Sequence, residues 1–155
     1  MARVYYTIKK PAKYVADHKG AHYTFDNERF FNGGEYVEMA CKEYAGVPVI
    51  KDASTPYNVA ADIPEMGASV KSSAATVVNM KLAETLEKSL DVYFKNDASS
   101  EYWYGTIEQN ILTIYKMTEK TFRRFLEKFC GLNERGYLRL KKENKQMIQW
   151  LKVNA

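Results

Sequence analysis

The chain has 155 residues, of which 46% are hydrophobic and 27% are charged, and its formal net charge is +4. This length and composition predict one globular domain over residues 1–155 with its own hydrophobic core. No apolar run approaches the roughly 18 residues that span a bilayer, and the N-terminus lacks the apolar segment of a signal peptide, so we expect a cytoplasmic protein with no membrane partner.

Few side chains in the sequence could bind a soft metal. There are only two cysteines and two histidines, and their positions do not form the spacing of a zinc site. Cys41 and Cys130 lie in apolar helical contexts, which favours buried free thiols over a disulfide. Any bound metal is therefore expected to have oxygen ligands.

The first third of the chain predicts a strand, a loop and a helix. Residues 3–10 form a β-rich run that Pro11 ends, and residues 16–34 have the composition of loops and turns. Residues 35–45 predict a helix, because apolar side chains recur at helical spacing until Gly46, a natural C-terminal stop.

The next segment predicts a β-hairpin that sets an acid beside a lysine. Residues 57–63 and 68–78 are β-rich, and the "PEMG" between them has the length and residue types of a hairpin loop. If Ile63 pairs with Ala68, then Asp62 lies opposite Ser69, and Lys71 is two residues further along the same face. The small neighbouring side chains would leave that face open, which is typical of a site rather than of a core.

The second half of the chain alternates helices with strands. Residues 79–94 predict an amphipathic helix, and residues 101–108 and 111–117 predict a hairpin with "QN" as its turn. Thr118 is the expected N-cap of a helix that Gly131 stops, and a short strand and a final helix follow. The order of these elements predicts a mixed α/β fold in which helices flank a central mixed sheet.

The positive charge is concentrated near the C-terminus. Residues 116–155 hold eleven Lys or Arg and four Asp or Glu, so this segment carries +7 and the remainder −3. Such a segment is either a solvated surface or a binding face for nucleic acid, with DNA favoured, that contacts phosphates without base specificity. The candidate binding residues are Arg123, Arg124, Lys128, Arg139, Lys141, Lys142 and Lys145.

Residues 30–80 resemble, in order and spacing, the PD-(D/E)xK nuclease superfamily, which includes restriction endonucleases and Holliday-junction resolvases. The family pattern is a glutamate on a helix, an aspartate that ends a strand, and an acid-x-Lys motif on the next strand. "NGGEYVEMACKEYAG", "VAADI" and "GASVKS" stand in that order here. The resemblance implies a restriction-endonuclease-like fold with Glu38, Asp62 and Lys71 as catalytic residues. It also implies that Mg²⁺ or Mn²⁺ binds to Glu35, Glu38 and Asp62.

The chemistry of phosphodiester hydrolysis explains these residue types. A divalent metal held by carboxylates acts as the Lewis acid, and a nearby lysine orients the attacking water and offsets the developing negative charge. Ser69 departs from the pattern, because it stands where the family has an acid and a hydroxyl is a weaker metal ligand than a carboxylate.

Alternatives stay open for the same residues. Lys71 could protect an edge strand, Asp62 could serve only the turn, and Glu38 could pair with Lys42 on the surface of the helix. The first hypothesis is thus a small metal-dependent nuclease, with a homodimer suited to double-strand cleavage. The second is an inactive nuclease-like protein, of a phage or mobile element, that binds nucleic acid or inhibits a nucleic-acid enzyme. A third is a structural oligomer subunit.

Overall fold

A four-stranded mixed sheet forms the centre of the molecule, in a computed structural model that describes residues 6–32, 34–50, 62–72, 77–141 and 145–155. The strand order is β1 (Tyr6–Lys9), β6 (Ile111–Met117), β5 (Glu101–Glu108) and β4 (Ala68–Ser72). Strand β6 pairs antiparallel with both neighbours, whereas β4 pairs parallel with β5. The mixed α/β class with a sheet flanked by helices is therefore confirmed.

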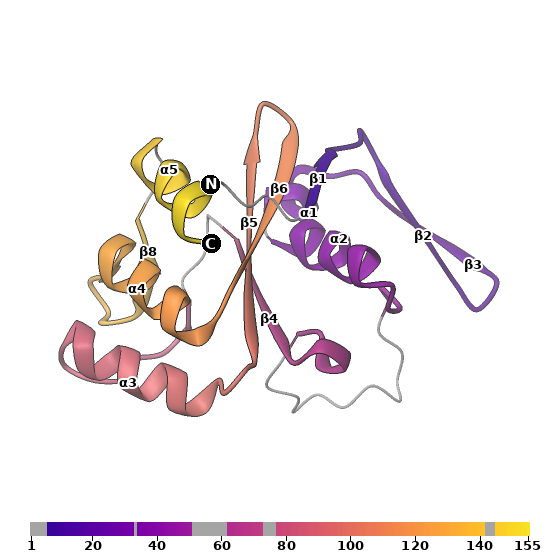
Figure 1. The fold of residues 1–155 in the computed structure, drawn as a ribbon. Coiled ribbons are helices and arrows are strands. Elements are labelled where there is room, and N and C mark those ends of the chain that lie inside the picture. The colour runs from indigo at the N-terminus through magenta and orange to yellow at the C-terminus, as the bar shows by residue number, and fades with distance from the viewer. Residues whose placement is uncertain (1–5, 33, 51–61, 73–76, 142–144) are drawn as a thin grey trace.

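Three helices cover one face of this sheet (Figure 1). They are α3 (Leu86–Asn96), α4 (Glu119–Phe129) and α5 (Lys145–Asn154), and the short hairpin of β7 (Cys130–Leu132) and β8 (Leu138–Leu140) lies beside them. Thr118 caps α4, because its side chain accepts a hydrogen bond from the backbone N–H of Thr121. Buried side chains fill this layer, among them Tyr102, Tyr104, Tyr115, Phe122, Phe125, Leu126, Met147 and Leu151.

The opposite face is covered by α1 (Glu28–Asn32) and α2 (Glu35–Ala45). Trp103 alternates with its neighbours on β5, so its ring lies on this second face, where it packs in one cluster with Val37, Ala40 and Cys41. A separate ribbon of β2 (Tyr14–His18) and β3 (Ala21–Phe25) projects beyond these helices (Figure 1). In the part of the chain that the structure describes, no helix is long and apolar enough to cross a membrane.

Two-residue turns occur at one place where the sequence predicted a hairpin and at one place where it predicted a loop. Gln109 and Asn110 both adopt positive φ, which fits the predicted two-residue hairpin turn between β5 and β6. The prediction of a loop over residues 16–34 is wrong, because Lys19 and Gly20 form an equivalent turn between β2 and β3. The alternation of Tyr14 and Ala16, which are buried, with exposed neighbours was the signal for that strand.

Three helix and strand boundaries also differ from the predictions. Helix α3 begins at Leu86 rather than at residue 79, because the side chain of Thr85 caps it by accepting from the N–H of Lys88. Helix α4 ends at Phe129, and Gly131 lies within β7 instead of serving as a helix stop. Strand β4 spans Ala68–Ser72, and of the rest of the predicted strand residues 77–78 are not in a strand. Residues 73–76, and residues 57–61 of the predicted partner strand, lie outside the described residues.

Close packing of α2 on the sheet yields a stability prediction at Gly105. A Cβ added there would clash with Val37 Cγ1, so the helix or the strand would have to shift. We expect Gly105→Ala to lower the free energy of unfolding by about 1–3 kcal/mol, as overpacked cores do, in urea denaturation. Gly131→Ala is the control, because no atom lies within 4 Å of its added Cβ. Equal stability of the Gly105→Ala variant and the wild type would contradict this packing.

Candidate functional site

Asp62 lies at the outer edge of strand β4. The predicted pairing of Ile63 with Ala68 is confirmed, since the two residues exchange backbone hydrogen bonds of 2.9 and 3.2 Å across the turn Pro64–Met66. The Asp62 carboxylate then accepts a 2.7 Å hydrogen bond from the backbone N–H of Val70. Because β4 is the last strand of the sheet among the described residues, this bond fixes the carboxylate beside the sheet edge, between its two covered faces.

Charges from three different elements act on Asp62. Burial raises the pKa of its carboxyl group, and the negative charges of Glu38 on α2 and Asp97 after α3 raise it further. The Val70 N–H and the ammonium group of Lys71 act in the opposite direction and lower it. The predicted helix glutamate, Glu38, and the predicted lysine, Lys71, thus both affect the pKa of Asp62.

Lys71 lies on the face of the sheet that carries α3. It is in register with Tyr104 of the parallel strand β5, whose ring belongs to that layer. Its Nζ lies 3.5 Å from the carbonyl oxygen of Val77 and 5.8 Å from the centre of the Tyr93 ring. Glu38 comes from the helix on the other face, so Lys71 and Glu38 approach Asp62 from opposite sides of the sheet edge.

The hydroxyl of Ser69, which the hairpin prediction placed opposite Asp62, is bonded to a different carboxylate, that of Asp97. The Ser69 side chain is buried, and its hydroxyl donates to the Asp97 carboxylate at distances of 2.9 and 3.0 Å. Ser69 shares the α3 face of β4 with Lys71, and the parallel pairing of β4 with β5 brings the segment between α3 and β5 beside it.

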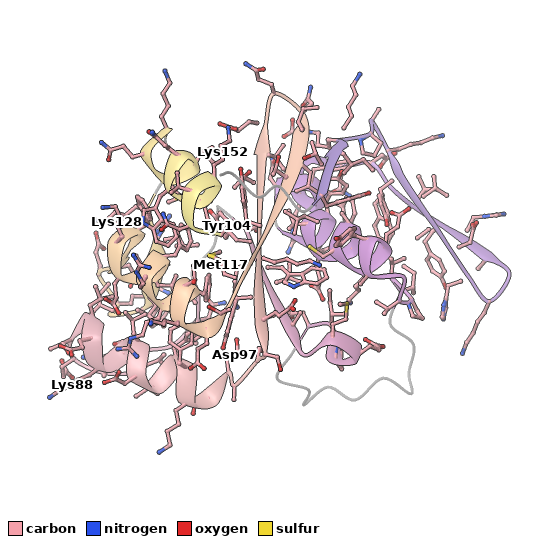
Figure 2. All side chains as sticks on the ribbon, viewed as in Figure 1. Lys88, Asp97, Tyr104, Met117, Lys128 and Lys152 are labelled. Carbon is pink, nitrogen blue, oxygen red and sulfur yellow. The ribbon has the colours of Figure 1, made fainter. Side chains whose placement is uncertain are left out.

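Asp97 is the acceptor at the centre of a hydroxyl cluster that we call the Asp97 cluster: Ser69, Tyr93, Asp97 and Ser99. The Tyr93 hydroxyl donates to Oδ2 at 3.0 Å and the Ser99 hydroxyl to Oδ1 at 2.7 Å. Burial and the Asp97 charge raise the pKa of Tyr93, which keeps its hydroxyl protonated as a donor. Figure 2 shows Asp97 where α3 leads into β5.

The helix glutamates differ in their surroundings. Glu38 Oε1 lies 3.1 Å from Lys42 Nζ, so the i,i+4 pair that the sequence left open is formed, and the Lys42 side chain is only 7% exposed. Glu35 is exposed in the first turn of α2 and is not among the groups that shift the pKa of Asp62. Of the two predicted helix ligands, Glu38 is therefore the one whose charge affects Asp62.

Two carboxylates, Asp62 and Glu38, interact electrostatically at this edge. Asp62 and Glu38 are close enough to raise the pKa of Asp62 by repulsion, and a cation between them would relieve it. Among the described residues, no three His, Cys, Asp or Glu side chains are grouped as metal ligands. Mg²⁺ commonly takes one or two carboxylates and completes its shell with water, and the ammonium group of Lys42, 3.1 Å from Glu38, already offsets part of the negative charge here.

The predicted basic residues that the structure describes lie on α4, β8 and α5 or directly after β8. Arg123 forms ion pairs with Asp91 at 2.6 Å and Glu127 at 3.1 Å, so its charge is locally neutralised. Lys142 lies outside the described residues. The remaining predicted residues are exposed: Arg124, Lys128, Arg139, Lys141 and Lys145.

Comparison with known proteins found no similar protein. No family model matches the chain, and no match was found among curated proteins or solved structures. The argument for function therefore depends on the geometry of the site.

Sequence reasoning missed Asp97 and Lys42 as neighbours of the site. Asp97 belongs to the polar run "NDASS" between a helix and a strand, which is typical of a loop and gave no sign of a contact with residue 69. Lys42 appeared only as a surface partner of Glu38, whereas the structure buries it.

The raised pKa of Asp62 predicts a pH-dependent effect on stability. The folded pKa lies above the unfolded value of about 3.9, so ionisation costs the folded state stability as pH rises through the folded pKa. Asp62→Asn removes this cost and retains an oxygen for the Val70 N–H. In EDTA, we expect the variant to exceed the wild type in unfolding free energy at pH 8, with the advantage disappearing below pH 4. A difference in unfolding free energy between the variant and the wild type that does not change with pH would contradict the raised pKa of Asp62.

Proposed function

We propose that the chain is a small metal-dependent nuclease that hydrolyses phosphodiester bonds, with DNA as the favoured substrate. The supporting observation is that the partly buried carboxyl group of Asp62 is affected by the charges of a helix glutamate and a strand lysine, the residue types that the PD-(D/E)xK resemblance assigns to a nuclease site. In this proposal the mixed sheet with its flanking helices corresponds to a restriction-endonuclease-like core.

Each residue has a defined task in the proposed site. Asp62 and Glu38 would hold Mg²⁺ or Mn²⁺, and the bound ion would supply the Lewis acid for attack on the phosphate. The Val70 N–H fixes the orientation of Asp62, so that the carboxylate need not reorganise during the reaction. Lys71 would orient the attacking water and offset negative charge in the transition state.

The basic surface supports the choice of a nucleic-acid substrate. The exposed cations on α4, β8 and α5 can neutralise phosphates of a bound strand or duplex without reading bases. Arg123 contributes less to this surface than the sequence suggested, because two acidic side chains already pair with it.

A second candidate is a nuclease-like protein that binds nucleic acid, or inhibits a nucleic-acid enzyme, without catalysis. The observation that favours it is the burial of Ser69 against Asp97, since the position of the family's second acid is occupied by a structural hydroxyl. Neither residue is then available as a ligand beside Asp62.

Incubation of the wild-type protein with plasmid, linear duplex and single-stranded substrates separates the two candidates. Reactions would contain Mg²⁺, Mn²⁺ or EDTA. Cleavage that requires the divalent ion supports the nuclease. Binding of the same substrates with no cleavage under any condition would overturn the nuclease and support the binding protein.

A further inference from the structure

A polar recess of about 600 Å³ opens beside the β7–β8 hairpin, on the α3–α5 side of the sheet. We call it the loop recess, and the residues that matter to its chemistry are Asn79, Asn133, Glu134, Arg135, Tyr137 and Arg139. It is open to solvent rather than enclosed, so a ligand group would lie against its residues instead of being surrounded by them.

The loop that forms the recess is fixed by its own hydrogen bonds. Asn133 Oδ1 accepts from the backbone N–H groups of Arg135 and Tyr137, both at 2.9 Å, and the Asn133 N–H donates to the Tyr137 carbonyl. Gly136 has φ +81°, and a Cβ there would lie 3.2 Å from the stem of Lys81, so the loop also packs closely on the preceding segment. Arg135 and Tyr137 are therefore presented from a preorganised backbone.

Two guanidinium groups give the recess an excess of positive charge over its single carboxylate, Glu134. Arg135 and Arg139 are both exposed. Arg139 lies opposite Gly131 in the β7–β8 ladder, and nothing lies within 4 Å of the position where a Gly131 side chain would begin. The space beside the Arg139 side chain, above Gly131, is therefore unfilled. Guanidinium groups bind phosphate oxygens in bidentate geometry.

The loop recess is connected to Lys71 through Val77. The Lys71 ammonium group donates to the Val77 carbonyl, while the Val77 N–H donates to the Leu138 carbonyl of β8 at 2.7 Å. Asn79, which lines the recess, is two residues beyond Val77, a chain span of about 7 Å at most. A strand that occupies the recess would therefore be close to the proposed lysine.

We propose that the loop recess binds a nucleotide unit of a single-stranded nucleic acid, with Arg135 and Arg139 on its phosphates and the Tyr137 ring against its base. The orientation of this strand toward Lys71 rests on the proposed function, whereas the binding itself does not. Guanidinium contacts supply salt-dependent affinity, and an aromatic ring stacks on any base, so the recess selects a single strand without reading its sequence.

The test is fluorescence anisotropy with a short labelled oligothymidylate, an oligouridylate of equal length and a duplex, across a salt series in EDTA. The double variant Arg135→Ala/Arg139→Ala is expected to lower the slope of log affinity against log salt by about 1.4, or 0.7 for each lost contact. Tyr137→Leu should weaken binding of the single strands roughly 5- to 100-fold. Arg29→Ala on α1 is the control, because it removes an exposed arginine from the other side of the sheet.

The outcomes separate this inference from the proposed nuclease. Preference for the oligothymidylate or the oligouridylate identifies DNA or RNA as the source of the strand. Unchanged slope and affinity in the double variant, or tighter binding of the duplex than of both single strands, would overturn the inference. Arginine-dependent binding without any cleavage in Mg²⁺ would refute the nuclease alone.

Discussion

Asp62→Asn is expected to abolish metal-dependent cleavage while the protein stays folded. The substitution removes the negative charge that the metal requires, but it keeps a side-chain oxygen that can accept the hydrogen bond from Val70. Circular dichroism and thermal unfolding would verify the fold, and a plasmid nicking assay would measure the activity. Cleavage by the variant at the wild-type rate would show that Asp62 is not a catalytic residue.

Lys71→Met tests the second half of the same site. It preserves most of the aliphatic stem beside Tyr93 and removes the ammonium group, so the rate should fall by about 10²- to 10⁴-fold, the usual contribution of a positioned acid or base. The double variant should be no slower than Asp62→Asn alone, because residues that act as a unit are not additive. Lys88→Met, on the outer surface of α3 (Figure 2), is the matched control and should cleave like the wild type.

Asp97→Ala is expected to cause a large loss of stability. It removes the carboxylate that accepts from the hydroxyls of Ser69, Tyr93 and Ser99. Ser69 and Ser99 lie 2.7 Å apart and can still bond each other, so two hydroxyl hydrogens lose their acceptor, and each unsatisfied buried group costs about 1–3 kcal/mol. We therefore expect the free energy of unfolding in urea to fall by about 2 kcal/mol or more.

Two further variants qualify the result at Asp97. Asp97→Asn retains one acceptor oxygen and should lose less stability than Asp97→Ala. Glu108→Ala removes an exposed carboxylate at the end of β5 and should change the free energy of unfolding by less than about 0.5 kcal/mol. Equal effects of Asp97→Ala and Glu108→Ala would show that the Asp97 cluster does not hold α3 to β4.

Local patterns predicted the local structure well. The Gln109–Asn110 turn, the Thr118 cap and the apolar face of α2 all depend on interactions within a few residues, which the sequence displays directly. The turn after Asp62 was predicted for the same reason, down to the pairing of Ile63 with Ala68.

Long-range pairing could not be predicted in the same way. Nothing local indicates that β4 pairs in parallel with β5, about thirty residues later, and this pairing brings the Asp97 segment beside Ser69. The hairpin prediction therefore gave no sign that the Ser69 hydroxyl bonds to Asp97. The approach of Glu38 and Lys71 from opposite faces depends on the same topology.

Binding of Mn²⁺ tests the proposed site most directly, because it requires neither the right substrate nor the right product assay. Calorimetric titration of the wild-type protein, of Asp62→Asn and of the exposed-acid control Asp26→Asn would be compared at the same pH. The account predicts saturable binding to the wild type and the control, and loss of that binding in Asp62→Asn. No saturable binding to the wild type, or unchanged affinity in Asp62→Asn, would contradict a metal site at this edge of the sheet.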